Sequence, residues 1–250
     1  MFPVALAATL HDTDARLVPA IERLGEGLRE LFAGIALNAS DATHAAVLAA
    51  ARERLGAKLI VHPQGEAGIG RARRDAVRLA LEFPAPAILY CDFDHLIRWA
   101  RSDAAELRAT LAAEPEVDFL VVGHSAQAFA AEPRRLQDTE RLVNHAYALL
   151  TGHPWDLMFA VRRMSRRAAE DIVRLSVVDT IANDVEWPLL AERSGLSLGY
   201  AAANGLHYRT MEDFDAAADR KDGDALEWIR RIEFAAQHAA AMRPYLSGKD

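Results

Sequence analysis

The chain has 250 residues, of which 51% are hydrophobic and 26% are charged, a composition typical of a globular protein with a sizeable core. Its 36 acidic and 29 basic residues give a net charge of -7, which argues against a protein that binds the phosphate backbone of nucleic acids. Cys91 is the only cysteine, so no internal disulfide can form, and we expect it to be buried and inert. We find neither a signal peptide nor the run of about 18 apolar residues that crosses a bilayer, and we expect a cytoplasmic protein.

In the first half of the chain, short apolar runs alternate with amphipathic, alanine-rich stretches. The expected strands are Val4–Leu10, Phe32–Leu37, Leu59–His62 and Ala87–Cys91. The expected helices between them are Asp14–Leu31, Asp41–Leu55 and Ile69–Glu82. This rhythm predicts an α/β fold of the Rossmann-like kind, with a mostly parallel central sheet flanked by helices. In such sheets, ligands bind beyond the carboxyl ends of the strands.

The second half is less regular. We expect strands at Asp118–Gly123, Leu157–Val161 and Leu198–Tyr208, and helices at Pro133–Leu150, Ser165–Leu175 and Asp224–Met242. The last of these is amphipathic. It is expected to pack on the core, although a homodimer contact or a membrane contact would use the same pattern. We find no repeat and no convincing linker, so one domain over residues 1–250 is expected.

Two carboxylates directly follow the fourth expected strand. Strand alternation would place Asp92 and Asp94 on the same side, with Phe93 directed into the packing. Two like charges so close repel each other unless a cation lies between them, and Mg²⁺ or Mn²⁺ favours hard carboxylate oxygens. The pair therefore predicts a divalent metal site. The alternative is that one aspartate caps the next helix while the other is solvated.

These segments give the chain a resemblance to a known family. From Val4 to Thr210 it resembles the A-type (GT-A) nucleotide-sugar glycosyltransferases, especially the family 2-like enzymes and their relatives that make mannosyl- or glucosyl-glycerate compounds. Gly70 to Ala76, followed by the strand into Asp92-Phe93-Asp94, is similar to the Gly-x-Ala-Arg-Asn segment that precedes the family's Asp-x-Asp. His11-Asp12 and Asp41 match family positions that follow the first two strands. Asn183 to Glu186 resembles a later acidic motif, and Gly205 to Tyr208 resembles a segment that carries a late histidine.

The chain also departs from the family's pattern. Ala8 to His11 replaces a Pro-x-Tyr-Asn segment, and Asn38 to Asp41 replaces an Asp-Gly-Ser-Thr-Asp segment. Arg74 stands where the family has asparagine. These differences leave open which base the nucleotide carries.

The resemblance implies a metal-dependent transfer of a sugar from a UDP- or GDP-linked donor to a small hydroxyl acceptor. It implies that Mg²⁺ or Mn²⁺, held by Asp92, Asp94 and His207, acts as a Lewis acid on the departing diphosphate. The donor contacts it implies are His11, Asp12, Asp41, Arg71, Arg73 and Asp92. Asp184 or Glu186 would deprotonate the acceptor in an inverting enzyme. The domain would then comprise a nucleotide-binding half (1–95), an acceptor half (96–222) and a C-terminal helix (223–250).

Three other classes share part of the pattern. A phosphatase of the haloacid-dehalogenase type also has Asp-x-Asp after an apolar strand, but Leu96 replaces its threonine and no lysine lies between Lys58 and Lys221. A nucleotidyltransferase would share the fold and the metal, but its glycine-rich loop is missing after Leu10. A non-catalytic relative that only binds a nucleotide or a partner protein is the third.

Overall fold

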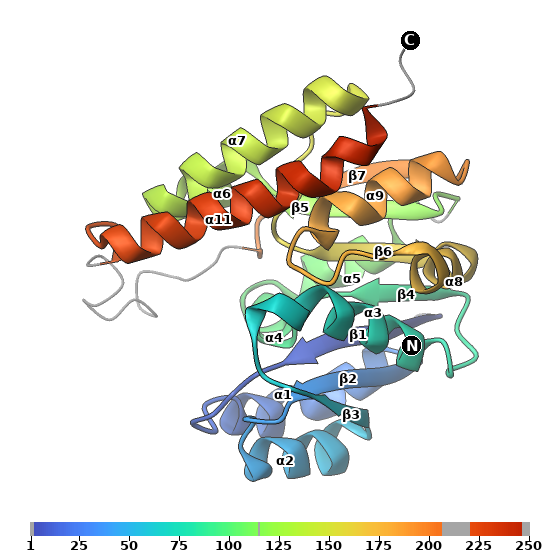
Figure 1. Ribbon diagram of the computed structural model, residues 1–250. Helices are drawn as coiled ribbons and strands as arrows, with labels where there is room; N and C mark the ends of the chain where they lie inside the picture. Colours follow the sequence, from blue (N-terminus) through green and yellow to red (C-terminus); the bar gives the residue numbers. More distant parts are fainter. Residues whose placement is uncertain (1–2, 115, 207–220, 247–250) are drawn as a thin grey trace.

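A single seven-stranded sheet, in the order β3-β2-β1-β4-β6-β5-β7, forms the centre of the molecule (Figure 1). The computed structural model describes residues 3–114, 116–206 and 221–246. The strands are β1 (Val4–Leu10), β2 (Gly34–Ser40), β3 (Lys58–His62), β4 (Ala87–Tyr90), β5 (Phe119–His124), β6 (Val161–Ser165) and β7 (Leu198–Ala203). All neighbours pair in parallel except β6, which runs antiparallel to both β4 and β5. The predicted mostly parallel α/β sheet is therefore confirmed.

Helices cover both faces of this sheet. They are α1 (Val18–Leu31), α2 (Ala45–Leu55), α3 (Ile69–Ala80), α4 (Phe93–Ser102), α5 (Ala104–Ala112), α6 (Ala126–Ala130), α7 (Arg134–Thr151), α8 (Arg166–Leu175), α9 (Asn183–Arg193) and α11 (Ala225–Met242). Two short 3₁₀ turns, η1 (Glu66–Gly68) and η2 (Arg243–Tyr245), complete the regular structure of the described residues. None of the helices within these described residues is long and apolar enough to cross a membrane.

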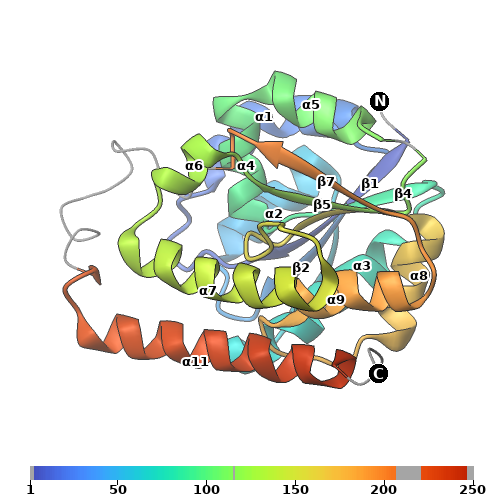
Figure 2. The same cartoon turned by 90° about the horizontal axis from the view of Figure 1, so that it is seen from above.

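Strand alternation divides the core into two layers. The even-numbered residues of β1, such as Leu6, pack with α1, α2, α4 and α5, whereas Ala5 and Ala7 pack with α3, α8 and α9. Figure 2 shows these two groups of helices on opposite sides of the sheet. Because both faces are covered, every residue of β1 is buried, as expected for a central parallel strand.

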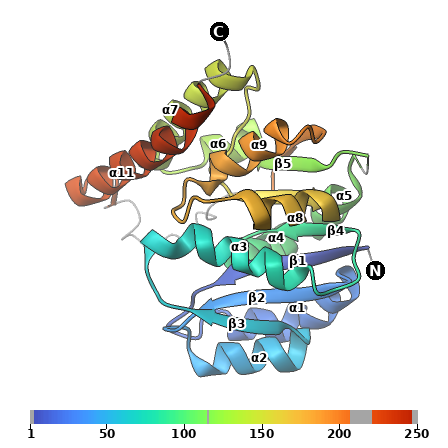
Figure 3. The same cartoon turned by 45° about the vertical axis from the view of Figure 1, so that its right-hand side comes forward.

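The C-terminal helix lies far from the N-terminal strands in sequence but close to the sheet in space. Helix α11 packs along α7 and also against α9 (Figure 3). Its Phe234 and His238 reach residues that belong to the first strands and to α9, respectively. The helix therefore forms a wall at one end of the sheet.

Three expected strands differ from the observed ones. The strand expected at Phe32–Leu37 is β2, which runs from Gly34 to Ser40. The strand expected at Leu157–Val161 is wrong, because the chain reaches the sheet only at Val161, after Ala160 has taken a left-handed φ of 53°. The charged pair Arg162-Arg163 concealed the true strand, since both side chains are buried and bonded to carbonyl oxygens. The strand expected at Leu198–Tyr208 ends at Ala203, and Tyr208 lies outside the described residues.

Candidate functional site

A pocket opens where the first three strands reach the carboxyl edge of the sheet. His11 follows β1, Ser40 ends β2 and His62 ends β3, and all three line this pocket of about 450 Å³. Nδ1 of His11 lies 2.7 Å from Oγ of Ser40, and Nδ1 of His62 lies 2.9 Å from Oδ1 of Asn38. Burial lowers the pKa of His62 despite nearby Asp41, so its neutral ring can donate one hydrogen bond and accept another. The apolar part of the wall comes from Ile69, Ile181 and Phe234.

Two acids expected to contact a nucleotide bind backbone in this structure. The buried carboxylate of Asp12 accepts hydrogen bonds from the backbone N–H groups of Asp14, Arg16 and Leu17, at 3.2, 3.1 and 2.8 Å. Asp12 therefore fixes the turn that leads from β1 into α1. Asp41 accepts the backbone N–H of Gln64 at 2.9 Å through Oδ1, but it remains exposed and accessible to a ligand.

Asp92 is held by three donors at the end of β4. Thr9 donates to its Oδ1 at 2.5 Å, Tyr90 donates to the same oxygen, and Arg73 pairs with Oδ2 at 3.0 Å. Burial alone would raise the pKa of Asp92, but Arg73, His95 and the two hydroxyl donors outweigh it and lower the pKa to about 2. Asp92 is therefore a fixed negative charge at neutral pH.

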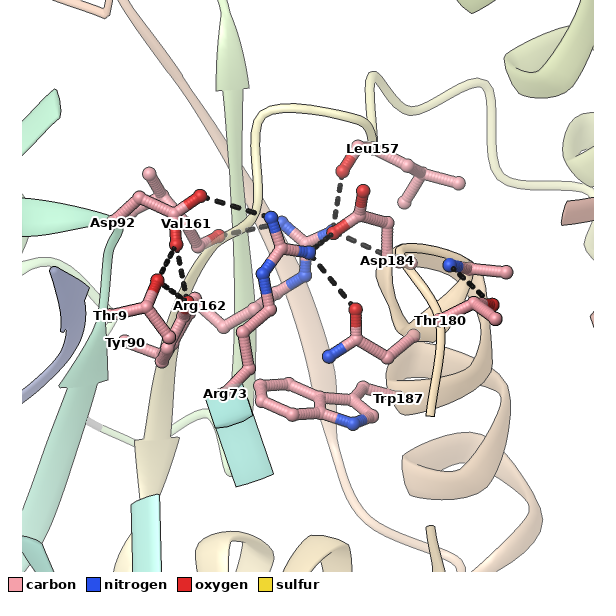
Figure 4. Close-up of polar contacts among 12 residues, drawn as sticks. Thr9, Arg73, Tyr90, Asp92, Leu157, Val161, Arg162, Thr180, Asp184 and Trp187 are labelled. Atoms are coloured by element: carbon pink, nitrogen blue, oxygen red, sulfur yellow. Dashed lines mark hydrogen bonds and ion pairs between the residues drawn. The ribbon is translucent and has the colours of Figure 1, made fainter. Parts of the chain in front are cut away.

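Arg73 joins this carboxylate to the start of α9 (Figure 4). Its guanidinium bonds Oδ2 of Asp92 at one nitrogen, and at the other it bonds Oδ1 of Asp184 at 2.8 Å and Oδ1 of Asn183 at 3.0 Å. Arg73 is only 4% exposed and Asp184 only 3%. Burial acts against the charge of Arg73, but Asp92 and Asp184 raise its pKa above the ordinary value. We expected Arg73 to face a diphosphate, but in the structure its guanidinium bridges two carboxylates of its own chain.

Asp94 and Asp92 do not lie on one extended strand. The expectation that both point to one side of an extended strand is wrong, because β4 ends at Tyr90 and α4 begins at Phe93. Asp94 sits in the first turn of α4, pairs with Arg98 one turn later, and keeps about half of its side chain exposed (49%). Nε2 of His95 lies 3.9 Å from Oδ2 of Asp94, and burial lowers the pKa of that histidine.

Two further expected site residues, Glu186 and Arg71, have partners in their own chain. Glu186 is buried, and its carboxylate accepts hydrogen bonds from Oγ of Ser176 and from the backbone N–H groups of Val177 and Val178 at 2.6, 2.9 and 3.1 Å. Its position does not support the expected role as a catalytic base. Arg71 is exposed and pairs with Asp179, and His207 lies outside the described residues.

Several residues of the site had no motif to reveal them. Thr9 and Tyr90 are polar residues inside apolar strands, which is a usable signal, because buried hydroxyl groups require partners. Phe234 and His238 belong to a helix that periodicity assigns to the core, and nothing local in the sequence connects that helix to the edge of β1. Their place follows only from the tertiary packing.

Comparison with known proteins shows the fold. No known family matches the chain in sequence, and neither does any curated protein. Similar folds occur in crystal structures of glucosyl-3-phosphoglycerate synthase from Mycobacterium tuberculosis. The UDP complex is 12% identical over 100% of this chain and 82% of its own, with a TM-score of 0.58. A complex with Mn²⁺, UDP-glucose and phosphoglyceric acid is 10% identical over 100% of this chain and 81% of its own, also at 0.58.

A third structure of that enzyme holds Mn²⁺, UDP-glucose and glycerol 3-phosphate. It is 11% identical, with coverage of 100% of this chain and 82% of its own, and a TM-score of 0.57. The chain thus has the GT-A type of fold, as the motifs after β1, β2 and β4 indicated. At these identities the likeness concerns the fold, and the chemistry depends on the residues of the site.

Proposed function

We propose that this protein is a glycosyltransferase that moves a sugar from a nucleoside diphosphate to a small hydroxyl acceptor. The proposal rests on the pocket at the ends of β1, β2 and β3. One of its lining residues, His11, follows Thr9 by two positions, and Thr9 donates a hydrogen bond to Asp92. In parallel α/β sheets this edge is where ligands bind, and the solved structures of the same fold include complexes with UDP and UDP-glucose.

The pocket has the chemistry of a nucleoside site. Ile69, Ile181 and Phe234 offer an apolar wall for a planar base, while the rings of His11 and His62 offer hydrogen-bonding groups. The exposed carboxylate of Asp41 lies at the end of the adjacent strand β2 and would accept a hydrogen bond from the base or ribose. Arg71, exposed in the first turn of α3 and paired with Asp179, would contact the diphosphate.

The same reaction uses a divalent ion, Mg²⁺ or Mn²⁺, in our proposal. Asp94 fits such an ion, because its side chain is half exposed and the ion could replace Arg98 at a hard carboxylate oxygen, whereas the less exposed Asp92 has donors on both oxygens. The ion would supply positive charge that stabilises the departing nucleoside diphosphate. Asp92 would then act on the donor through its fixed charge, and His207 remains a proposed ligand outside the described residues.

Asp184 takes a positioning role in this proposal. Its side chain is buried against Arg73, which makes it a poor acceptor of a proton from a substrate hydroxyl. Through Arg73 it instead orients Asp92 toward the donor site. Of the alternatives considered from the sequence, the phosphatase is not supported, because the chain has the GT-A type of fold.

The test is the melting temperature of the protein with UDP, GDP and their sugar conjugates, each with and without Mn²⁺. A ligand at about 100 times its Kd stabilises a fold by about 2.7 kcal/mol, which corresponds to a rise of roughly 5–10 °C for a chain of this size. We expect the rise with one nucleotide class, and we expect Asp94→Ala to remove the part that depends on Mn²⁺.

A second measurement follows release of the nucleoside diphosphate from the stabilising sugar conjugate, with small hydroxylated acids and phosphates as acceptors. A rise in melting temperature together with release of the nucleoside diphosphate establishes the transferase. Stabilisation without release under any acceptor would favour the non-catalytic nucleotide-binding relative. The proposal is wrong if no nucleotide changes the melting temperature.

A further inference from the structure

A second group of metal-ligating side chains lies at the end of β5, on the far side of the sheet centre from β3. It consists of His124 at the end of β5, Glu140 on α7 and Asp156 in the segment before β6. One ligand atom from each of the three lies within 4.8 Å of the others. The three come from three separate elements, so the fold itself brings them together.

Burial makes this group unusual. His124 and Glu140 are each only 5% exposed, and the side chain of Asp156 is 11% exposed. Oε2 of Glu140 is buried and has no hydrogen-bond partner among the described residues. A buried carboxylate oxygen without a donor is costly, and a cation is one of the partners that would remove the cost.

Two of the three side chains already contact each other. Nδ1 of His124 lies 2.6 Å from Oδ2 of Asp156, so an ion bound by both would take the place of the proton between them. Nε2 of His124 lies 3.4 Å from Oε1 of Glu132, and Asn144 donates to the second oxygen of Asp156 at 2.8 Å. Glu132 and Asn144 are thus outer partners of the kind that hold the ligands of protein metal sites in place.

Carboxylates surround the imidazole of His124. Those of Glu132, Glu140 and Asp156 face it, and Arg231 on α11 lies 3.6 Å from Glu140. A surrounding rich in carboxylate oxygens favours a divalent cation.

We propose that His124, Glu140 and Asp156 bind a divalent transition-metal ion of the Zn²⁺ type. One imidazole nitrogen and two carboxylate oxygens form a mixed N/O ligand set that suits Zn²⁺ better than Mg²⁺. His124 and Asp156 also line a pocket of about 500 Å³, together with Tyr200, Trp155 and Arg141. The ion would therefore have an open side, where water or an anionic small molecule reaches the fourth coordination position.

The test is the uptake of Zn²⁺ by the chelator-treated protein, measured by equilibrium dialysis and by the melting temperature. We expect one tightly bound equivalent that raises the melting temperature. Glu140→Gln and Asp156→Asn are expected to weaken this binding by at least about 100-fold, because the loss of an outer partner alone costs 10–100-fold. The matched control is Asp138→Asn on the exposed face of the same helix, which should bind Zn²⁺ as the unaltered protein does.

Two features keep the test decisive. Glu140→Gln replaces a poorly compensated buried carboxylate by a neutral amide of the same size, so the metal-free variant should melt no lower than the unaltered protein. Asp94→Ala should retain the equivalent of Zn²⁺, which separates this site from the one in the proposed transferase. The inference is overturned if the unaltered protein takes up no stoichiometric Zn²⁺, or if Glu140→Gln takes it up equally well.

Discussion

At the scale of single residues, Arg73 organises the candidate site. Its guanidinium lies between Asp92 and Asp184, and Asn183 completes its contacts. Arg71 and Arg78 of the same helix are exposed and each pair with one acid, whereas buried Arg73 serves the buried Asp184 and the part-buried Asp92. The three side chains therefore form one unit, and removing its centre leaves two negative charges that are largely shielded from water.

This arrangement predicts a large loss of stability in Arg73→Met. Breaking a buried ion pair from one side typically costs 3–5 kcal/mol, because the partner charge stays buried without compensation. We expect a loss of about that size in the free energy of unfolding, measured by urea denaturation. Arg71→Met, on an exposed ion pair of the same helix, should change it by less than about 1 kcal/mol. Equal effects of the two changes would contradict the bridging role.

The residue scale also shows what the sequence reveals about a site. Asp92 was identified because two acids after a buried strand are conspicuous, and Asp41 because it follows the second expected strand. The partners of Asp92 were not identified from the sequence. Pairing of β1 with β4 brings Thr9 and Tyr90 to it, and packing of α3 on the sheet brings Arg73. The observed contacts of Arg73 and Glu186 differ from their expected roles for the same reason. A charged residue in a helix looks alike whether it faces solvent or a buried acid.

At the scale of elements, α3 approaches the rest of the protein more closely than its sequence suggests. A Cβ atom placed on Gly70 would lie 2.3 Å from the carbonyl oxygen of Thr180 and 2.8 Å from that of Val178. The helix can reach this segment only because position 70 has no side chain. This close approach brings Arg73, one turn further along, within reach of Asp184.

Gly70→Ala should therefore destabilise the protein, although alanine favours helices. Overpacking of a tight contact costs typically 1–3 kcal/mol, which outweighs the gain of 0.5–1 kcal/mol from replacing a helical glycine. Gly27→Ala is the control, because Gly27 lies in α1 with no atom within 4 Å of the added Cβ. That variant should gain stability in the same urea titration. A stabilised Gly70→Ala would show that α3 does not press on residues 178–180.

Some element ends were predicted closely and others were not. The helices from Arg134, Arg166 and Ala225 begin within one residue of their expected starts, because their apolar periodicity is strong. Helices α1 and α2 begin four residues after the expected Asp14 and Asp41. Strand β6 was misplaced because burial of Arg162 inverts the usual rule that charged residues lie outside a sheet. Its side chain bonds the carbonyl oxygens of Val161, Leu157 and Asp184 instead of water.

At the scale of the whole molecule, paired carboxylates determine the response to acid. The pKa of Asp92 is lowered to about 2 although burial opposes the shift, and hydrogen bonds from Arg71 and Arg74 lower the pKa of Asp179. Both carboxyl groups bind protons more readily in the unfolded chain. Their contribution is complete above the ordinary pKa of 3.8 and is lost as the pH falls toward the lowered values.

We therefore expect the free energy of unfolding to fall steeply between about pH 4 and pH 2. Asp92→Asn should be less stable than the unaltered protein at pH 6, and the difference between them should shrink as the pH falls. Chemical denaturation at a series of pH values measures both curves. A difference that stays constant down to pH 2 would mean that Asp92 is not the charged partner of Arg73.

The position of α11 has a consequence for how the protein is made. Phe234 closes a pocket whose other walls come from residues 11 to 69 and from Ile181, and His238 stands 3.7 Å from Asp184. A ribosome delivers the N-terminal strands first, so the strands that carry the pocket exist long before their last wall. A chain stopped before residue 225 would contain the seven described strands and lack that wall. In the proposed transferase, such a shortened chain would therefore bind the nucleotide more weakly than the whole one.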